Sequence, residues 1–202
     1  MIGIVDYGVG NLFSLKSSFY AIGQTALVSD DPAVLGACDR LILPGVGAFG
    51  DASEKLRASG LDRLVCRQAE QGVPLLGICL GMQMLFEESL EHGRYKGLGL
   101  LKGQVCPIVP KDPAVHKIPH IGWNGLHVTQ PSLLFAEVRE GDEVYFVHSY
   151  SARDCADSVI ATVEYGEELT AAVAQGNVYG TQFHPEKSGP VGLSILKAFC
   201  QF

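Results

Sequence analysis

The sequence lacks an apolar run that approaches the roughly 20 residues needed to cross a membrane. It also lacks any CxxC pair among its six cysteines, so the usual spacing of zinc ligands is missing. The first residues are typical of a strand, not of a signal or transit peptide. We therefore expect a cytoplasmic protein with reduced thiols, no membrane contact, no metal and no cofactor.

Positive charge is also scarce, because the chain has 15 lysines and arginines against 22 acidic residues and a net charge of −7. A nucleic-acid partner would require an excess of basic residues to neutralise phosphates, and so would an anionic membrane surface. The composition therefore argues against both. No internal repeat and no low-complexity linker divides the chain, so we expect a single domain over residues 1–202.

Hydrophobic residues and glycine are abundant: hydrophobic residues make up 47% of the chain and glycine occurs 24 times. Short apolar runs at 2–5, 26–29, 40–43 and 73–78 are typical of buried parallel strands. Later segments, including a hairpin pair at 159–163 and 171–175, favour antiparallel strands. The prediction is an α/β fold, in which an open, mostly parallel twisted sheet has helices on both faces. It is flavodoxin-like, with appended antiparallel strands.

The segment from Gly45 to Gly50 matches G-x-G-x-x-G literally, so a dinucleotide site must be weighed. The match does not follow the first strand, Pro44 precedes it, and the next strand lacks a terminal acid for a ribose. No GK[ST] follows any glycine loop, which excludes a P-loop. We expect instead that this loop presents backbone N–H groups to a neighbouring strand end.

Residues 71–88 carry the most informative pattern in the chain. A short apolar run is followed by Cys79, which has Gly77 and Gly81 on either side, and the pattern then changes to helical spacing. A nucleophile elbow has this form, because its crowded turn leaves no room for a Cβ at the flanking positions. A helix N-terminus there would favour thiolate over thiol. The alternative is a buried structural cysteine beside two packing glycines.

A second pattern, His184-Pro185-Glu186, ends the strand at 178–183. A general base needs its ring fixed in one tautomer, and a carboxylate on the far nitrogen does this. In an extended chain, side chains at i and i+2 project to the same side. Because both patterns follow strands, we expect Cys79, His184 and Glu186 to form a triad at the carboxyl edge of the sheet.

Other candidate residues have less support. His148 follows a clear strand and is a candidate base, although a histidine satisfied in the core is equally expected there. His116 and His120 are four residues apart, but Pro119 prevents a ligand-bearing helix, so a metal site is not expected. Residues 117–124 are predicted to be a loop that holds the single tryptophan, and residues 87–93 an acidic helix end.

With these residues in view, the chain resembles the class I (triad-type) glutamine amidotransferases, and among them the glutaminase subunits of imidazole glycerol phosphate synthase. The resemblance runs from the first strand to the last helix. The matching segments are IVDYGVGNL (4–12), PGVGAF (44–49), GICLGMQ (77–83), PHIGWN (119–124), YFVHSY (145–150) and GTQFHPEKSG (180–189).

The resemblance implies a fold, a reaction and a partner. Such enzymes release ammonia from L-glutamine by way of a thioester, without a cofactor. In that subfamily the ammonia passes through a channel into a (β/α)8-barrel cyclase subunit of a heterodimer. There it takes part in making imidazole glycerol phosphate and the aminoimidazole carboxamide ribotide (AICAR) in histidine biosynthesis.

The resemblance also implies roles for individual positions. The triad is Cys79, His184 and Glu186, with Val46, Gly47 and Leu80 as the source of oxyanion donors. The residues expected to bind the substrate's amino-acid end are Gly47, Gln83, Glu91 and Ser149. The residues expected to face the cyclase subunit are Asp6, Tyr7, Asn11, Trp123 and Lys187.

Three rivals remain open at this point. Another class I glutaminase, such as the one that feeds pyridoxal phosphate synthase, would share the elbow and the His-Pro-Glu motif. A cysteine peptidase or chaperone could use the same elbow. A binding module in which Cys79 is inert belongs to a different class altogether.

Overall fold

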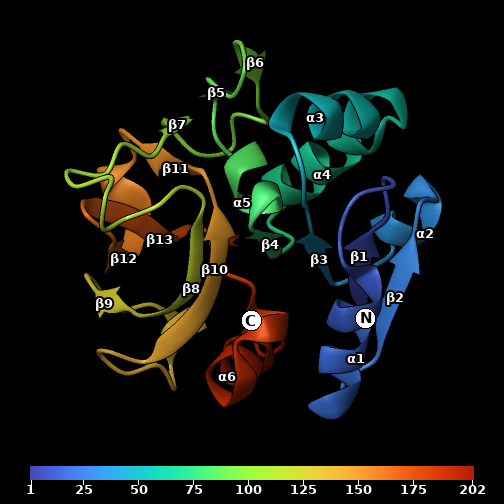
Figure 1. Ribbon diagram of the computed structural model, residues 1–202. Coiled ribbons are helices and arrows are strands. Elements are labelled where there is room, and N and C mark those ends of the chain that lie inside the picture. The colour runs from blue at the N-terminus through green and yellow to red at the C-terminus, as the bar shows by residue number, and fades with distance from the viewer.

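The computed structural model describes all residues from 1 to 202 and has one large sheet at its centre (Figure 1). The eight strands of this sheet run in the order β2-β1-β3-β4-β14-β13-β12-β9. Their bounds are β1 (Ile2–Val5), β2 (Ala26–Ser29), β3 (Arg40–Leu43), β4 (Leu75–Ile78), β9 (His127–Val128), β12 (Val159–Glu164), β13 (Glu168–Gln175) and β14 (Val178–Thr181). The first five strands in this order pair in parallel and the rest antiparallel, as predicted.

Helices cover both faces of the sheet (Figure 1). One face packs against α1 (Leu12–Ala21) and α6 (Gly189–Phe199), whose inward residues Phe19 and Phe199 belong to one buried cluster. The other face packs against α2 (Pro32–Gly36), α3 (Phe49–Ala58), α4 (Leu61–Glu70) and α5 (Leu80–Met84), which form a second cluster. Buried strands of four residues suffice because each has apolar neighbours on both sides. No helix is both long and apolar enough to span a bilayer.

Two smaller sheets extend the core. One pairs β8 (His120–Gly125) with β10 (Glu143–His148), and the other has the order β11-β7-β5-β6. The strands of the second sheet are β5 (Glu88–Ser89), β6 (Tyr95–Lys96), β7 (Gln104–Pro107) and β11 (Tyr150–Arg153). Three 3-10 turns complete the chain: η1 (Leu133–Phe135), η2 (Ala156–Ser158) and η3 (Pro185–Lys187).

Two local predictions are wrong. The acidic helix end expected at 87–93 is instead β5 and a turn, because the helix before it stops early. The carbonyl groups of Met84 and Leu85, at the end of α5, accept hydrogen bonds from the N–H groups of Leu98 and Leu100, at 2.8 and 2.9 Å. These external donors replace the next helical turn. Arg94, just before β6, then holds Glu88 of β5 with two hydrogen bonds of 2.6 and 2.8 Å.

The second wrong prediction is the loop at 117–124, most of which is strand β8. Its register with β10 places His120 opposite His148 and Trp123 opposite Tyr145. The alternation is inverted relative to an ordinary half-buried strand, because His120 is buried while Ile121 and Trp123 face solvent. Apolar residues pointing outward conceal the period that identifies a strand.

Candidate active site

The turn between β4 and α5 holds Cys79 in a strained backbone conformation. Cys79 has φ 54° and ψ −111°, a positive φ that L residues rarely adopt. A Cβ on Gly81 would lie 1.8 Å from the Leu43 carbonyl oxygen, and one on Gly77 would lie 2.7 Å from the Gly81 carbonyl oxygen. The two flanking glycines are therefore required by contact, as a nucleophile elbow predicts.

His184 and Glu186 lie at the end of the neighbouring strand. The Nδ1 atom of His184 is 2.8 Å from Oε1 of Glu186, and both side chains are almost fully buried. The pair does not sit on extended chain as expected. Instead the 3-10 turn η3 follows His184 directly and brings the carboxylate back to the ring. Nδ1 of His184 has no other hydrogen-bond partner in the protein, so its contact with Glu186 fixes the orientation of the ring.

The segment after β14 is fastened to β10. The His184 N–H donates to the Tyr145 carbonyl at 3.0 Å. The Ser188 hydroxyl donates to the His184 carbonyl at 2.6 Å and accepts from the Tyr145 N–H at 3.0 Å. Three hydrogen bonds thus hold the backbone on either side of the imidazole, so the ring sits on a rigid support.

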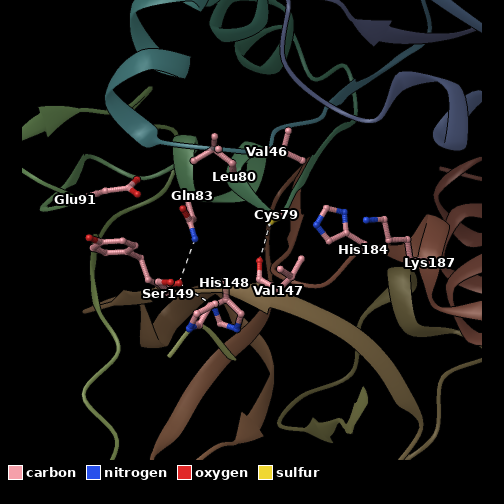
Figure 2. Close-up of a pocket in the computed structure, with 13 residues that line it drawn as sticks. Val46, Cys79, Leu80, Gln83, Glu91, Val147, His148, Ser149, His184 and Lys187 are labelled. Atoms are coloured by element: carbon pink, nitrogen blue, oxygen red, sulfur yellow. Dashed lines mark hydrogen bonds between the residues drawn. The ribbon is translucent and has the colours of Figure 1, made fainter. Parts of the chain in front are cut away.

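Electrostatics at His184 favour the protonated ring. Burial opposes protonation, but hydrogen bonds and negative charge from Cys79 and Glu186 outweigh burial and raise the pKa of His184 to about 9. Cys79 and His184 line the same cavity. Figure 2 shows the His184 ring beside Cys79. The arrangement can therefore hold a thiolate next to an imidazolium, which is the pairing that a cysteine nucleophile needs.

A cavity of about 350 Å³ opens over these residues (Figure 2). Most of the predicted site residues line it. They are Cys79, His184, Val46, Gly47, Leu80, Gln83, Glu91, Ser149 and Lys187. Glu186 stands behind His184 and does not line the cavity. The wall opposite the elbow comes from Val147, His148 and Tyr150.

Two of the predicted substrate residues already have partners within the protein. Both N–H groups of the Gln83 amide are used, one on the Tyr150 carbonyl at 3.2 Å and one on Oε1 of Gln182 at 3.0 Å. The amide oxygen of Gln83 is what remains for a ligand. Glu91 accepts the Phe49 N–H at 2.7 Å and so caps α3, which leaves its second oxygen free for other contacts.

His148 is structural and is not a base. Its Nδ1 donates to the Tyr150 carbonyl at 2.8 Å, and its Nε2 is 2.9 Å from Nδ1 of His120. Burial lowers the pKa of His148 to about 4, so the ring is neutral near pH 7. The alternative of a satisfied core histidine is therefore the one that the contacts support.

The tautomer of His148 also determines the hydrogen bonding of His120 and Asn124. Because Nε2 of His148 accepts, Nδ1 of His120 must donate, and its Nε2 then faces the Asn124 amide at 2.8 Å. Burial lowers the pKa of His120, which favours a neutral ring. Oδ1 of Asn124 is the atom placed beside Nε2, so a neutral ring requires the amide to be turned over, with its NH2 group facing Nε2. No group of three or more histidine, cysteine or acidic side chains is arranged to hold a metal.

The residues predicted to face a partner fall into three groups. Trp123 is half exposed, its ring 6.0 Å from Tyr145, and Lys187 lies over that tyrosine at 5.7 Å from the ring centroid. These three form a surface cluster, which we call the rim cluster because Lys187 also lines the cavity. Tyr7, in contrast, is buried, and its hydroxyl donates to the Pro44 carbonyl at 2.7 Å. The Tyr7 side chain therefore does not reach a partner-facing surface.

Asp6 and Asn11 both have local roles. The Asp6 carboxylate accepts the Gly8 N–H at 3.0 Å, and the Asn11 side chain caps α1 by accepting the Ser14 N–H at 3.3 Å. Both side chains are partly exposed, so contact with a partner stays a prediction. Neither lines the cavity.

One residue at the site was missed from the sequence. Gln182 is fully buried directly after β14, and its Nε2 lies 3.8 Å from the Cys79 sulfur. A glutamine at the end of a buried parallel strand, between Thr181 and Phe183, was the available signal. It was overshadowed by His184, two residues further on.

Comparison with known proteins identifies a family and close relatives. Residues 4–201 match the family described as "Glutamine amidotransferase class-I". A Geobacillus sp. (strain WCH70) protein described as "Imidazole glycerol phosphate synthase subunit HisH" is 52% identical over 202 residues, covering 98% of this chain and 95% of the relative. A Bacillus licheniformis protein of the same description is 50% identical over 205 residues, covering 100% of this chain and 96% of the relative.

A solved structure agrees on the fold. The chain aligns with one described as "Structure of PurLQS from Thermotoga maritima" with a TM-score of 0.75 at 22% identity. The alignment covers 99% of this chain and 97% of that chain. At this identity the likeness concerns the fold alone.

The crowding at the elbow makes a direct prediction about stability. Gly81→Ala places a Cβ against the Leu43 carbonyl, so we expect a loss of about 3 kcal/mol or more in the free energy of unfolding, measured with urea. Gly36→Ala is the matched control, because its Cβ would meet only the side chains of Leu64 and Gln68, at ordinary distances of 3.7 and 4.0 Å. Equal losses in the two variants would contradict the contact argument.

The buried His148 makes a prediction about acid stability. Its pKa is lower in the folded chain than in the unfolded one, so the unfolded state binds more protons between about pH 6.5 and 4. The stability that this residue contributes is full above about pH 6.5 and is lost progressively as the pH falls from there to about 4, by about 3 kcal/mol in all. We expect His148→Gln to flatten this acid loss in urea unfolding curves collected from pH 7 to pH 4.

His127→Gln is the control for this prediction. His127 is exposed, and its hydrogen bond to Glu140 raises its pKa, so its own contribution to stability falls as the pH rises instead. The acid loss should persist in His127→Gln. An unchanged slope in His148→Gln would show that other groups account for the acid loss.

Proposed function

Because the chain belongs to the class I glutamine amidotransferase family, we propose that it hydrolyses L-glutamine to glutamate and ammonia and delivers the ammonia to a cyclase subunit. The observation that carries this proposal is the meeting of Cys79 and the buried His184–Glu186 pair at one edge of the sheet. The relatives described as subunits of imidazole glycerol phosphate synthase place the activity in histidine biosynthesis. They also weigh against a peptidase, a chaperone or a different glutaminase.

The chemistry uses the three triad residues in sequence. The Cys79 thiolate attacks the side-chain amide carbon of glutamine and forms a C–S bond. His184, as the imidazolium, gives its proton to the departing nitrogen, so ammonia leaves and a thioester remains. The neutral imidazole then takes a proton from water, and the resulting attack breaks the C–S bond to give glutamate and the thiolate. Glu186 orients His184 and stabilises its charged form throughout.

Two tetrahedral intermediates form, and each carries an oxyanion. The Leu80 N–H, next to the nucleophile, and an N–H from the Val46–Gly47 loop are the proposed donors, since all three residues line the cavity beside Cys79. A donor of this kind stabilises the transition state by about 3–4 kcal/mol. Gly47 has φ 89°, so a side chain there would strain the loop that presents these groups.

The amino-acid end of glutamine is assigned to the opposite side of the cavity. The free amide oxygen of Gln83 and the second carboxylate oxygen of Glu91 are acceptors suited to an ammonium group. Ser149 and the Gly47 backbone offer donors suited to a carboxylate. Figure 2 shows Gln83 and Glu91 on the far side of Cys79 from His184, so these acceptors and the base lie on opposite sides of the nucleophile.

The ammonia is used by a partner in this proposal, namely a (β/α)8-barrel cyclase subunit in a heterodimer that makes imidazole glycerol phosphate and AICAR. The rim cluster supports this arrangement, because it contains an exposed tryptophan beside a tyrosine, and both residue types are enriched among those that contribute most to binding at interfaces. Asp6 and Asn11 are assigned to the edge of the same interface. A cytoplasmic location is part of this proposal.

The role of Cys79 can be tested with two nitrogen sources. In the complex with the cyclase subunit, Cys79→Ala should abolish product formation from glutamine, because no thioester can form, and leave formation from ammonium salts intact. Cys155→Ala, another buried cysteine, is the control and should support both reactions. Loss of both activities in Cys79→Ala, or of neither, would refute the assignment.

The rim cluster predicts where the partner binds. Trp123→Ala should raise the Kd for the cyclase subunit about tenfold or more, as measured by titration calorimetry, because a buried aromatic anchor is lost. Tyr20→Ala removes an aromatic side chain that is more exposed still, at the far end of α1, and should change the Kd less than about twofold. Similar effects of the two substitutions would place the interface elsewhere.

A further inference from the structure

A buried amide lies against the nucleophile and has no part in the mechanism above. Gln182 is fully buried, and its Nε2 lies 3.8 Å from the Cys79 sulfur, within the range of an N–H···S hydrogen bond. We propose that Gln182 is a positioning residue, whose side-chain N–H donates to the Cys79 thiolate and holds the sulfur ready for attack. This inference rests on the proposed role of Cys79 as nucleophile.

The direction of the Gln182 amide follows from a backbone carbonyl. The Tyr150 carbonyl can only accept, so the Gln83 group 3.2 Å from it must be the NH2 group. The second N–H of Gln83 then points to Gln182 at 3.0 Å, and the group that receives it must be the Gln182 oxygen. The NH2 group of Gln182 is left facing the sulfur. One carbonyl thus sets the polarity of two amides in a row (Figure 2 shows the Gln83 end).

The donor and the sulfur are also held at a fixed separation. Thr181 and Ile78 are register partners in the parallel pair β14–β4, so Gln182 and Cys79 are the next residues on adjacent strands. The Cys79 N–H donates to the Thr181 carbonyl at 2.7 Å, and the Gln182 N–H donates to the Ala171 carbonyl at 2.8 Å. The amide is therefore preorganised, with little side-chain entropy left to lose when the thiolate forms.

The surroundings of the sulfur explain why such a donor is needed. The Val147 carbonyl lies 4.0 Å from the Cys79 sulfur and can accept from the thiol. Once the proton is gone, that carbonyl dipole repels the thiolate. The Gln182 N–H instead presents the positive end of its dipole to the sulfur and so favours the thiolate. The Val147 carbonyl therefore favours the thiol, and the Gln182 N–H favours the thiolate.

Other titratable and charged groups face the same sulfur or line its cavity. His184 and, behind it, Glu186 come from the β14–η3 segment, His148 comes from β10, and the Tyr7 hydroxyl comes from the end of β1. Lys187 and Glu91 line the cavity further out. Gln182 differs from all of these because it carries no charge at any pH. Its contribution should shift the thiolate equilibrium without adding a second titration.

The test is the pH dependence of Cys79 alkylation by iodoacetamide, followed by mass spectrometry of the peptide that contains it. Gln182→Met keeps the volume and removes the donor, so we expect the midpoint of the alkylation curve to rise by about one pH unit. The plateau rate at high pH should stay unchanged. In the complex with the cyclase subunit, kcat for glutamine hydrolysis at pH 7 should fall about tenfold.

Two further variants make the test specific. Gln182→Glu keeps the oxygen that Gln83 binds but sets an oxygen against the sulfur, and should raise the midpoint further than Gln182→Met. Gln68→Met is the matched control, because Gln68 is a buried glutamine on α4 whose amide bonds Gln71 at 3.4 Å, away from the site. This control should leave the alkylation curve and kcat unchanged. A folded Gln182→Met protein with the original midpoint would overturn the proposal.

A measurement on the unsubstituted chain guards against a variant that fails to fold. In ¹⁵N-labelled protein, the side-chain amide resonances of Gln182 should follow the same pH midpoint as alkylation, and should shift when Cys79 is alkylated. Amide resonances that ignore both would also overturn the proposal. Neither the alkylation curve nor the amide resonances require glutamine. Both can therefore support or overturn the role of Gln182 even if Cys79→Ala retains glutamine-dependent activity and the proposed function fails.

Discussion

The parallel pairing of β4 with β14 is the interaction on which the site depends. Residue by residue, Leu75 to Ile78 lie beside Val178 to Thr181, so the two strands end at the same level. Cys79 leaves one strand end and Gln182 and His184 leave the other. Because both strands are buried on both faces, their register cannot slip without exposing apolar side chains. The alignment of the nucleophile with its base and its amide neighbour is thus a consequence of sheet packing.

Much of this could be predicted from sequence because the informative signals are local. The two glycines around Cys79 and the carboxylate two residues after His184 need no knowledge of distant contacts. The parallel strands could be read from their short apolar runs. The error at 87–93 has the opposite cause, since α5 ends where N–H groups from Leu98 and Leu100 reach its carbonyls. A propensity argument has no access to such a contact. The outward-facing Ile121 and Trp123 likewise disguised β8.

Side-chain roles were harder to predict than side-chain positions. Tyr7 and Trp123 are both aromatic residues in matching motifs, yet one is buried under Pro44 and the other is half exposed. Gln83 and Gln182 sit on different elements, and only the fold shows that they bond to each other. The Tyr150 carbonyl, which accepts from both Gln83 and His148, orients one chain of groups toward the sulfur and another toward Asn124. The orienting role of a backbone carbonyl cannot be predicted from a pattern of side chains.

The contact between Gly81 and the Leu43 carbonyl has a consequence for protein engineering. The elbow fits because the adjacent strand β3 passes so close that its backbone occupies the space of a side chain. A grafted loop carrying Gly-Ile-Cys-Leu-Gly alone would bring only half of that geometry to a new scaffold. The smallest transferable unit is two neighbouring strands with their spacing intact. A host sheet with a different twist at that point would deform the turn.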